Sequence, residues 1–148
     1  MNITQVRSYG EKKTQRMVKL ETLLDNIKNE GKECLVTTMR HSLQSCGDTE
    51  RNIYAKKLPQ LLFAAGFKKD SETQVMKQYN GLVLLEVNNL SGMDEAASIR
   101  HIASGFPQTK AAFIGSTGKT VKILVPFTLP DGTLPHTYRE AELFHAHE

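Results

Sequence analysis

The chain has 148 residues, of which 39% are hydrophobic and 24% are charged, and this balance predicts one globular domain over residues 1–148. A disordered chain is excluded, because it would carry fewer apolar residues and more net charge than the +3 found here. No apolar run approaches the ~18 residues of a membrane span and the N-terminus lacks the apolar core of a secretory signal, so we expect a cytoplasmic protein without membrane contact.

The first thirty residues predict a strand, a loop and a helix. Residues 3–9 alternate weakly between apolar and polar types, as a short strand does. Residues 10–19 carry four Lys or Arg side chains and are predicted as a basic loop. Leucine and isoleucine at positions 20, 23, 24 and 27 have the spacing of an amphipathic helix, which we expect to end at Gly31.

The middle of the chain predicts two more helices and a hairpin. The first helix is predicted over residues 35–43. The second begins at Asp48 or Thr49, since either side chain can cap a helix, and it ends before Pro59. The short apolar run at residues 61–65 predicts a strand. Residues 68–77 are predicted to form a polar hairpin that leads into another strand.

The second half of the chain predicts an alternation of strands and helices. A nearly continuous apolar run at residues 82–87 is typical of a central strand, and helical spacing follows at residues 96–106. Two strands are then predicted, at residues 111–114 and 121–127, before a helix begins at residue 140. This order is that of the first five elements of a ferredoxin-like βαββαβ unit. Since the sixth strand is missing and the last helix is short, we expect a fragment of a longer protein.

The predicted fold class is therefore α+β, with a mostly antiparallel sheet. An RRM-like or ferredoxin-like half spans residues 82–148, lacks its last strand and is packed by helices on one face. An N-terminal α/β half lies beside it.

A glycine-rich segment at residues 115–120 is not a Walker A loop. That motif needs four residues between its first glycine and the Gly-Lys pair, and only two separate Gly115 from Gly118. It must also begin a helix, whereas a strand is predicted here. The segment is best interpreted as a hairpin turn, although its amides, with Lys119 and Lys122, would also suit a phosphate.

Glu86 and Asn88 lie two residues apart, so strand periodicity places both on one face. Two carboxylates at this spacing would bind divalent metal ions for phosphoryl transfer, but here one of them is an amide. From the residues alone, we favour a strand end that leaves the core.

Other candidate groups are weaker. Cys34 and Cys46 are too few for a disulfide framework and are expected to be reduced thiols outside any zinc motif. His145 and His147 are two residues apart, which is the wrong spacing for a zinc pair on a helix. The basic residues between 12 and 19 are interpreted as a solvated face.

Several segments together resemble the VirE-like N-terminal domain family, whose members resemble primase–polymerase modules of the archaeo-eukaryotic primase superfamily. The resemblance runs over nearly the whole chain. It is carried chiefly by YNGLVLLEVNNL at residues 79–90, by FIGSTGKTVKILV at 113–125, by FTLPDG at 127–132 and by AELFHAH at 141–147. It implies a domain at the front of a bacterial primase/helicase-like protein of a conjugative or other mobile element.

The resemblance also assigns residues. The superfamily's metal-binding Asp-x-Asp matches Glu86-Val87-Asn88, and its nucleotide-contacting Ser-x-His matches Thr120-Val121-Lys122. A third acidic residue lies on a strand that this chain does not reach. The resemblance thus implies a vestigial Mg²⁺ or Mn²⁺ site at Glu86 and Asn88. The implied phosphate or nucleotide contacts are Ser116, Gly118, Lys119, Thr120 and Lys122.

We therefore expect a degenerate primase–polymerase-like domain of a mobile-element DNA replication protein. It would bind single-stranded or primed DNA and a nucleotide, beside a C-terminal helicase/primase-like domain; if active, it would be a nucleotidyltransferase. If the sheet has one open face, Glu86, Asn88 and Lys122 meet there. One alternative is a non-catalytic interaction module that positions the C-terminal domain. The other is an RRM-type RNA binder, which needs exposed aromatics where the strand at 121–127 offers only Phe127.

Overall fold

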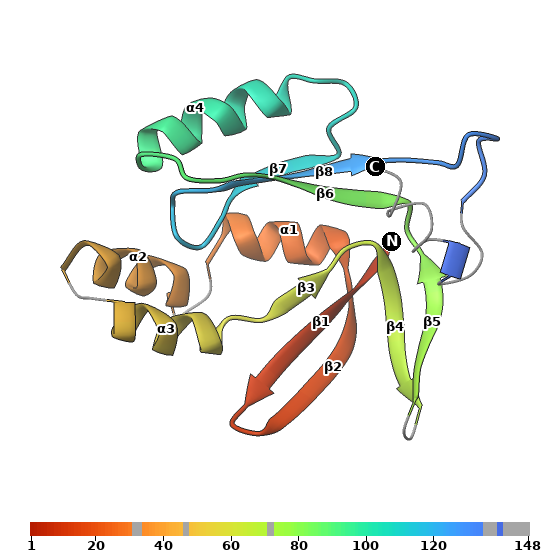
Figure 1. Ribbon diagram of the computed structural model, residues 1–148, viewed down its shortest axis with the longest axis horizontal. Helices are drawn as coiled ribbons and strands as arrows, with labels where there is room; N and C mark the ends of the chain where they lie inside the picture. Colours follow the sequence, from red (N-terminus) through yellow and green to blue (C-terminus); the bar gives the residue numbers. More distant parts are fainter. Residues whose placement is uncertain (31–33, 46–47, 71–72, 135–138, 141–148) are drawn as a thin grey trace.

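The computed structural model describes residues 1–30, 34–45, 48–70, 73–134 and 139–140. Within them the chain forms eight strands and four helices, arranged as three small antiparallel sheets with helices between and beside them (Figure 1). The predicted α+β class is confirmed, although the sheet is divided into three. Gly31, Cys46 and the C-terminal helix predicted to continue beyond Glu140, with its two histidines, lie outside the described residues.

The N-terminal sheet has the strand order β2-β1-β3. Its strands are β1 (Asn2–Tyr9), β2 (Lys12–Lys19) and β3 (Gln60–Leu62). The predicted first strand is confirmed, but the predicted basic loop is wrong, because β2 pairs with β1 along its whole length. β2 is an edge strand whose residues are mostly exposed, so it needs few apolar side chains. Its sequence therefore lacks the alternation of apolar and polar residues that predicts a strand. Gly10, at a φ of 60°, supplies the left-handed backbone of the tight turn between them.

Three helices follow the predicted pattern. They are α1 (Leu20–Lys28), α2 (Leu35–Ser45) and α3 (Asp48–Lys57). Leu20 and Leu23 are the buried residues of α1, as the spacing predicts. The first turn of α2 is capped from a distance, because the Glu30 carboxylate accepts hydrogen bonds from the amides of Val36 and Thr37. Burial raises the pKa of Glu30, but the hydrogen bonds from Thr37 and Val36 outweigh it and lower that pKa overall.

The second sheet is the predicted hairpin, formed by β4 (Ala65–Asp70) and β5 (Thr73–Tyr79). The single strand expected at residues 61–65 is wrong, because β3 ends at Leu62 and β4 begins at Ala65. Phe63, between these strands, is buried in the core. A continuous apolar run conceals this break, because apolar side chains are needed in the core on both sides of it.

The third sheet contains the elements of the ferredoxin-like half. They are β6 (Leu82–Val87), α4 (Met93–Ser104), β7 (Ala111–Ile114) and β8 (Val121–Pro126). The order β6-β8-β7, with both pairings antiparallel, is that of the first three strands of a βαββαβ unit. The prediction of a central strand at residues 82–87 is wrong, since β6 lies at an edge of this sheet among the described residues.

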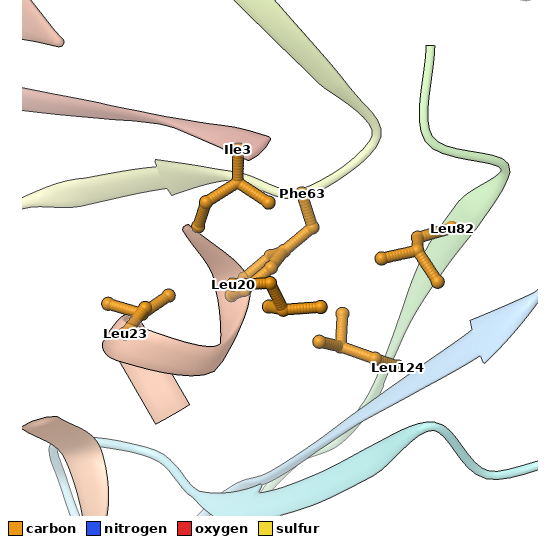
Figure 2. Packing of buried hydrophobic residues seen from close by; sticks show 6 residues of the cluster. All are labelled: Ile3, Leu20, Leu23, Phe63, Leu82 and Leu124. Atoms are coloured by element: carbon orange, nitrogen blue, oxygen red, sulfur yellow. The ribbon is translucent and has the colours of Figure 1, made fainter. Parts of the chain in front are cut away.

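Both faces of this sheet are covered, which corrects the prediction of helices on one face only. On one face, Val121 packs with Leu90 and Ala96, the latter from α4. On the other, Leu82 and Leu124 pack against residues from β1, α1 and the β3–β4 link (Figure 2). Figure 1 accordingly shows the sheet between α4 and α1. The continuous apolar run of β6 reflects this double cover rather than a central place in the sheet.

Among the described helices, none combines the length and the apolar character that crossing a membrane requires.

Candidate functional site

Glu86 and Lys122 form the centre of the candidate site. They are cross-strand partners on β6 and β8, and the Lys122 ammonium donates a hydrogen bond to a Glu86 carboxylate oxygen. Their side chains are 37% and 30% exposed, so the pair lies at the margin of the core. Strand alternation places both on the face that also carries Leu124. The structure therefore brings these two predicted residues together, but at the border of a covered face rather than on an open one.

Asn88 does not join this pair. The strand ends at Val87, so the period of two that predicted a shared face does not extend to residue 88. Asn88 is exposed, and no hydrogen bond or ion pair in the described part of the chain links it to Glu86 or Lys122. The next residue, Asn89, has a φ of 60° and turns the chain toward α4.

The pair does not suit a divalent metal ion. The one carboxylate that remains of the expected metal motif is neutralised by the lysine that was expected to contact phosphate. Within the ranges that the structure describes, no three His, Cys, Asp or Glu side chains are grouped as metal ligands. A site for phosphoryl transfer needs several carboxylates around its cations, so these residues do not fit Mg²⁺ or Mn²⁺ chemistry.

The glycine-rich segment is a closed hairpin turn between β7 and β8, as predicted. The Gly115 amide donates to the Thr120 carbonyl at 2.9 Å, and the Gly118 amide donates to the Gly115 carbonyl at 3.0 Å. The Lys119 amide donates to the Thr117 hydroxyl at 3.3 Å. Three of the turn's amides are thus used within the turn and are not directed at a common anion.

Close packing holds this turn in place. Gly118 has a φ of 75°, and a side chain there would meet the Met93 sulfur at 2.8 Å. The Lys119 carbonyl accepts a hydrogen bond from the Leu90 amide at 3.0 Å, which links the turn to the segment between β6 and α4. On the other side, the Arg40 guanidinium donates to the Gly115 carbonyl at 3.0 Å. Burial lowers the pKa of Arg40, and the charge of Glu30 opposes this by raising it.

The predicted phosphate contacts thus differ in their surroundings. Ser116, Gly118 and Thr120 are half-buried or buried within the turn, whereas the side chain of Lys119 is exposed. Lys122 is engaged with Glu86. Arg40 was missed from the sequence, because no local pattern indicates a contact across 75 residues.

The nearby N-terminus of α4 is already supplied with negative charge. Asp94 and Glu95 lie in its first turn, where carboxylates stabilise the helix dipole. The amide and hydroxyl of Ser91 donate to the Glu95 carboxylate at 2.7 and 2.8 Å, and these hydrogen bonds lower the pKa of Glu95. A phosphate at this helix end would be repelled, so an anion near the turn must rely on the lysine side chains.

An apolar groove that the sequence did not predict lies on the α4 face of the sheet. It has a volume of about 360 Å³ and lies between the second half of α4 and strands β6 and β8. Three of its lining side chains are strongly exposed: Leu85 at 49%, Ile102 at 61% and Phe106 at 58%. This groove adjoins β6, the edge strand beside which a complete βαββαβ unit would add another strand.

A protein-family model described as the BT4734-like N-terminal domain matches residues 54–148. The match begins within α3 and includes every element of the second and third sheets. No curated protein and no solved structure matches the chain.

Proposed function

The chain belongs to the BT4734-like N-terminal domain family, and we propose that it is a degenerate primase–polymerase-like domain that binds nucleic acid. The finer relationship, to VirE-like N-terminal domains of mobile-element replication proteins, is part of this proposal. So are a cytoplasmic location, a C-terminal helicase/primase-like partner domain and the binding of single-stranded or primed DNA with a nucleotide.

One observation carries the proposal: Glu86 and Lys122, which match two motifs of the superfamily, are direct partners across neighbouring strands. In a working site the carboxylate would bind a metal ion and the second motif would contact the nucleotide. Here the two charges neutralise each other, and Asn88 adds no carboxylate. The arrangement favours a domain that kept the sheet and its basic turn but lost metal-dependent synthesis.

The basic side chains around the turn provide the first test. Changing Lys119 and Lys122 to Glu should weaken the binding of labelled single-stranded DNA at least about tenfold. It should make the salt dependence shallower by at least roughly 0.7 log unit per log unit of salt, which is the share of one exposed lysine. Fluorescence anisotropy across a salt series measures both quantities. The same experiment with Mn²⁺ and dNTP tests nucleotide binding.

Two controls make this result specific. A variant with Lys28→Glu and Lys110→Glu carries the same charge change at two exposed positions outside the site. A second control, with Glu86→Lys and Lys122→Glu, exchanges the charges of the pair and so keeps their attraction across the strands. An unchanged affinity and slope in the Lys119→Glu, Lys122→Glu variant would remove these lysines from the DNA-binding surface.

Restoring the metal motif is a second test. Changing Glu86 and Asn88 to Asp should raise Mn²⁺ affinity measured by calorimetry, because two carboxylates replace one. Adding Lys122→Gln should raise it further, since the ammonium would no longer compete for the carboxylate. If Mn²⁺ affinity is unchanged in both backgrounds, the strand end has been repacked and no longer has the geometry of a primase-like metal site.

The apolar groove favours a second candidate function, an interaction module that positions a helicase/primase-like domain. Its exposed Leu85, Ile102 and Phe106 are the anchors that a protein contact needs. This candidate predicts no DNA binding at low salt by a chain whose circular dichroism shows it to be folded. The RNA-binding alternative is weakened, because Phe127 is half-buried and its ring packs edge-on against Tyr79 at a centroid distance of 5.9 Å.

A further inference from the structure

The hairpin formed by β1 and β2 concentrates positive charge. Residues 2–19 carry five Lys and Arg side chains against one carboxylate, Glu11, which gives a net charge of +4. The net charge of the whole chain is +3, so the net charge of the remaining residues is slightly negative and the hairpin is the source of the positive balance. In Figure 1 its tip extends away from the sheet of β6, β7 and β8.

Strand register sorts these charges between two faces. The cross-strand pairs Gln5–Arg16, Arg7–Thr14 and Tyr9–Lys12 all belong to one face, because residues two apart on a strand point the same way. At its other end this face continues into Ile3, which is in the core. The opposite face is turned toward β4, where the Gln15 side chain donates to the Phe67 carbonyl at 3.1 Å. The face toward the tip thus presents three cations and an exposed aromatic ring: Arg7, Lys12, Arg16 and Tyr9.

Contacts within the hairpin hold part of this face in position. A shallow depression of about 180 Å³ is lined by Gln5, Arg7, Tyr9, Thr14 and Arg16 of this face, together with Gln15 of the opposite face. The Arg16 guanidinium donates through Nε to the Oε1 atom of Gln5 at 2.7 Å. Because Gln5 is only 6% exposed, its side chain holds the Arg16 guanidinium in position. The remaining N–H groups of Arg16 can then bind an anion. The Nε atom of Arg7 is buried and has no hydrogen-bond partner among the described residues.

We propose that this face, here called the hairpin basic face (Arg7, Tyr9, Lys12 and Arg16), binds single-stranded nucleic acid. Guanidinium groups match phosphate oxygens with two parallel hydrogen bonds, and no carboxylate of the hairpin strands shares this face. Lys12 and Arg16 are four residues apart, about 13 Å along the strand, which allows contact with more than one phosphate. Tyr9 is 61% exposed beside them and offers a ring on which an unpaired base can stack.

The choice of nucleic acid as the partner rests on the proposed function, but the surface does not. The hairpin basic face lies on β1 and β2, whereas Lys119 and Lys122 lie on and after the turn between β7 and β8. Variants of the two surfaces can therefore be examined separately. An exposed ring distinguishes a single strand from a duplex, whose bases are already stacked on one another.

The test is a triple variant with Arg7, Lys12 and Arg16 changed to Gln. Its affinity for a fluorescein-labelled oligothymidylate should fall at least about tenfold, and its salt slope should become shallower by roughly 2 log units, because counterion release scales with the phosphates neutralised. Tyr9→Leu, which keeps an apolar side chain but cannot stack, should weaken binding about fivefold or more without changing the salt slope. The matched control changes Lys28, Arg100 and Lys110 to Gln, three exposed cations outside the hairpin.

Each outcome has a distinct meaning. If the triple variant binds like the control, the hairpin basic face is not a nucleic-acid surface, even if the Lys119 and Lys122 variant loses binding. If only the hairpin variants lose binding, this surface stands and the proposed role of the turn fails. Tighter binding to a duplex of the same length, or equal binding to vesicles containing phosphatidylserine, would overturn the assignment to a single strand. Circular dichroism of each variant confirms that it is folded.

Discussion

Leu124→Ala is expected to lower the free energy of unfolding by about 2–5 kcal/mol, the range of buried leucine truncations in well-packed cores. Leu124 is fully buried on the central strand β8 and packs in the cluster that joins the third sheet to β1 and α1 (Figure 2). Truncating it would leave a cavity where the third sheet packs against β1 and α1, and the surrounding side chains would fill that cavity only in part. Urea denaturation followed by circular dichroism measures the loss.

Leu85→Ala is the matched control for this change. Leu85 lies on the neighbouring strand β6 and is 49% exposed, so the same truncation removes less buried surface and opens no closed cavity. We expect it to cost less than about 1 kcal/mol. Equal losses in the two variants would contradict the described packing, in which Leu124 lies between the two halves.

Thr4→Val is expected to cost about 2–5 kcal/mol without changing the shape of the side chain, because it leaves buried backbone groups without partners. The Thr4 hydroxyl donates to the Ala65 carbonyl at 3.1 Å and accepts from the Phe67 amide at 2.7 Å. Thr4 is fully buried, so water cannot replace either bond. This single hydroxyl links β1 to β4 and hence the first sheet to the second.

Thr14→Val provides the comparison on the next strand. The Thr14 hydroxyl is exposed and donates to the Arg7 carbonyl at 3.4 Å, a bond at the long limit. Its loss should change stability by less than about 0.5 kcal/mol, since water satisfies the carbonyl. Thermal or urea denaturation of both variants gives the difference in stability. A small loss of stability for Thr4→Val would show that the two hydrogen bonds of the Thr4 hydroxyl are not formed in solution.

The elements with strong apolar periodicity could be predicted from the sequence. The spacing of Leu20 and Leu23 indicates α1, and the alternation from Val121 indicates β8, because burial of one stripe or one face requires those patterns. The same rule explains the missed strand β2, whose residues are mostly exposed and so carry no such pattern. It also explains the place of β6, because an apolar run reports that both faces are covered and not where the strand lies in the sheet.

The candidate site shows the same division. The period of two on β8 placed Lys122 opposite the row of Val121, and the superfamily resemblance pointed to Glu86. The ion pair between Glu86 and Lys122, however, depends on the register of two strands separated by α4 and β7. Arg40 reaches Gly115 from α2, and the hairpin basic face exists only because residues 12–19 pair with β1. Until the strand that pairs with residues 12–19 is known, the sequence does not show which of their basic side chains lie on the same face.

The amino-acid pattern is enough to predict the α+β class, the positions of most helices and strands, and the antiparallel β–α–β–β order of the second half. These follow from local periodicity, which each segment must satisfy to bury its own apolar side chains. Three features appear only in the folded chain: the sheet is covered on both faces, Lys122 neutralises Glu86, and Arg7, Lys12 and Arg16 share a face with Tyr9. They depend on contacts between distant segments, and the free energy of such contacts is set by strand register and packing and not by any one segment.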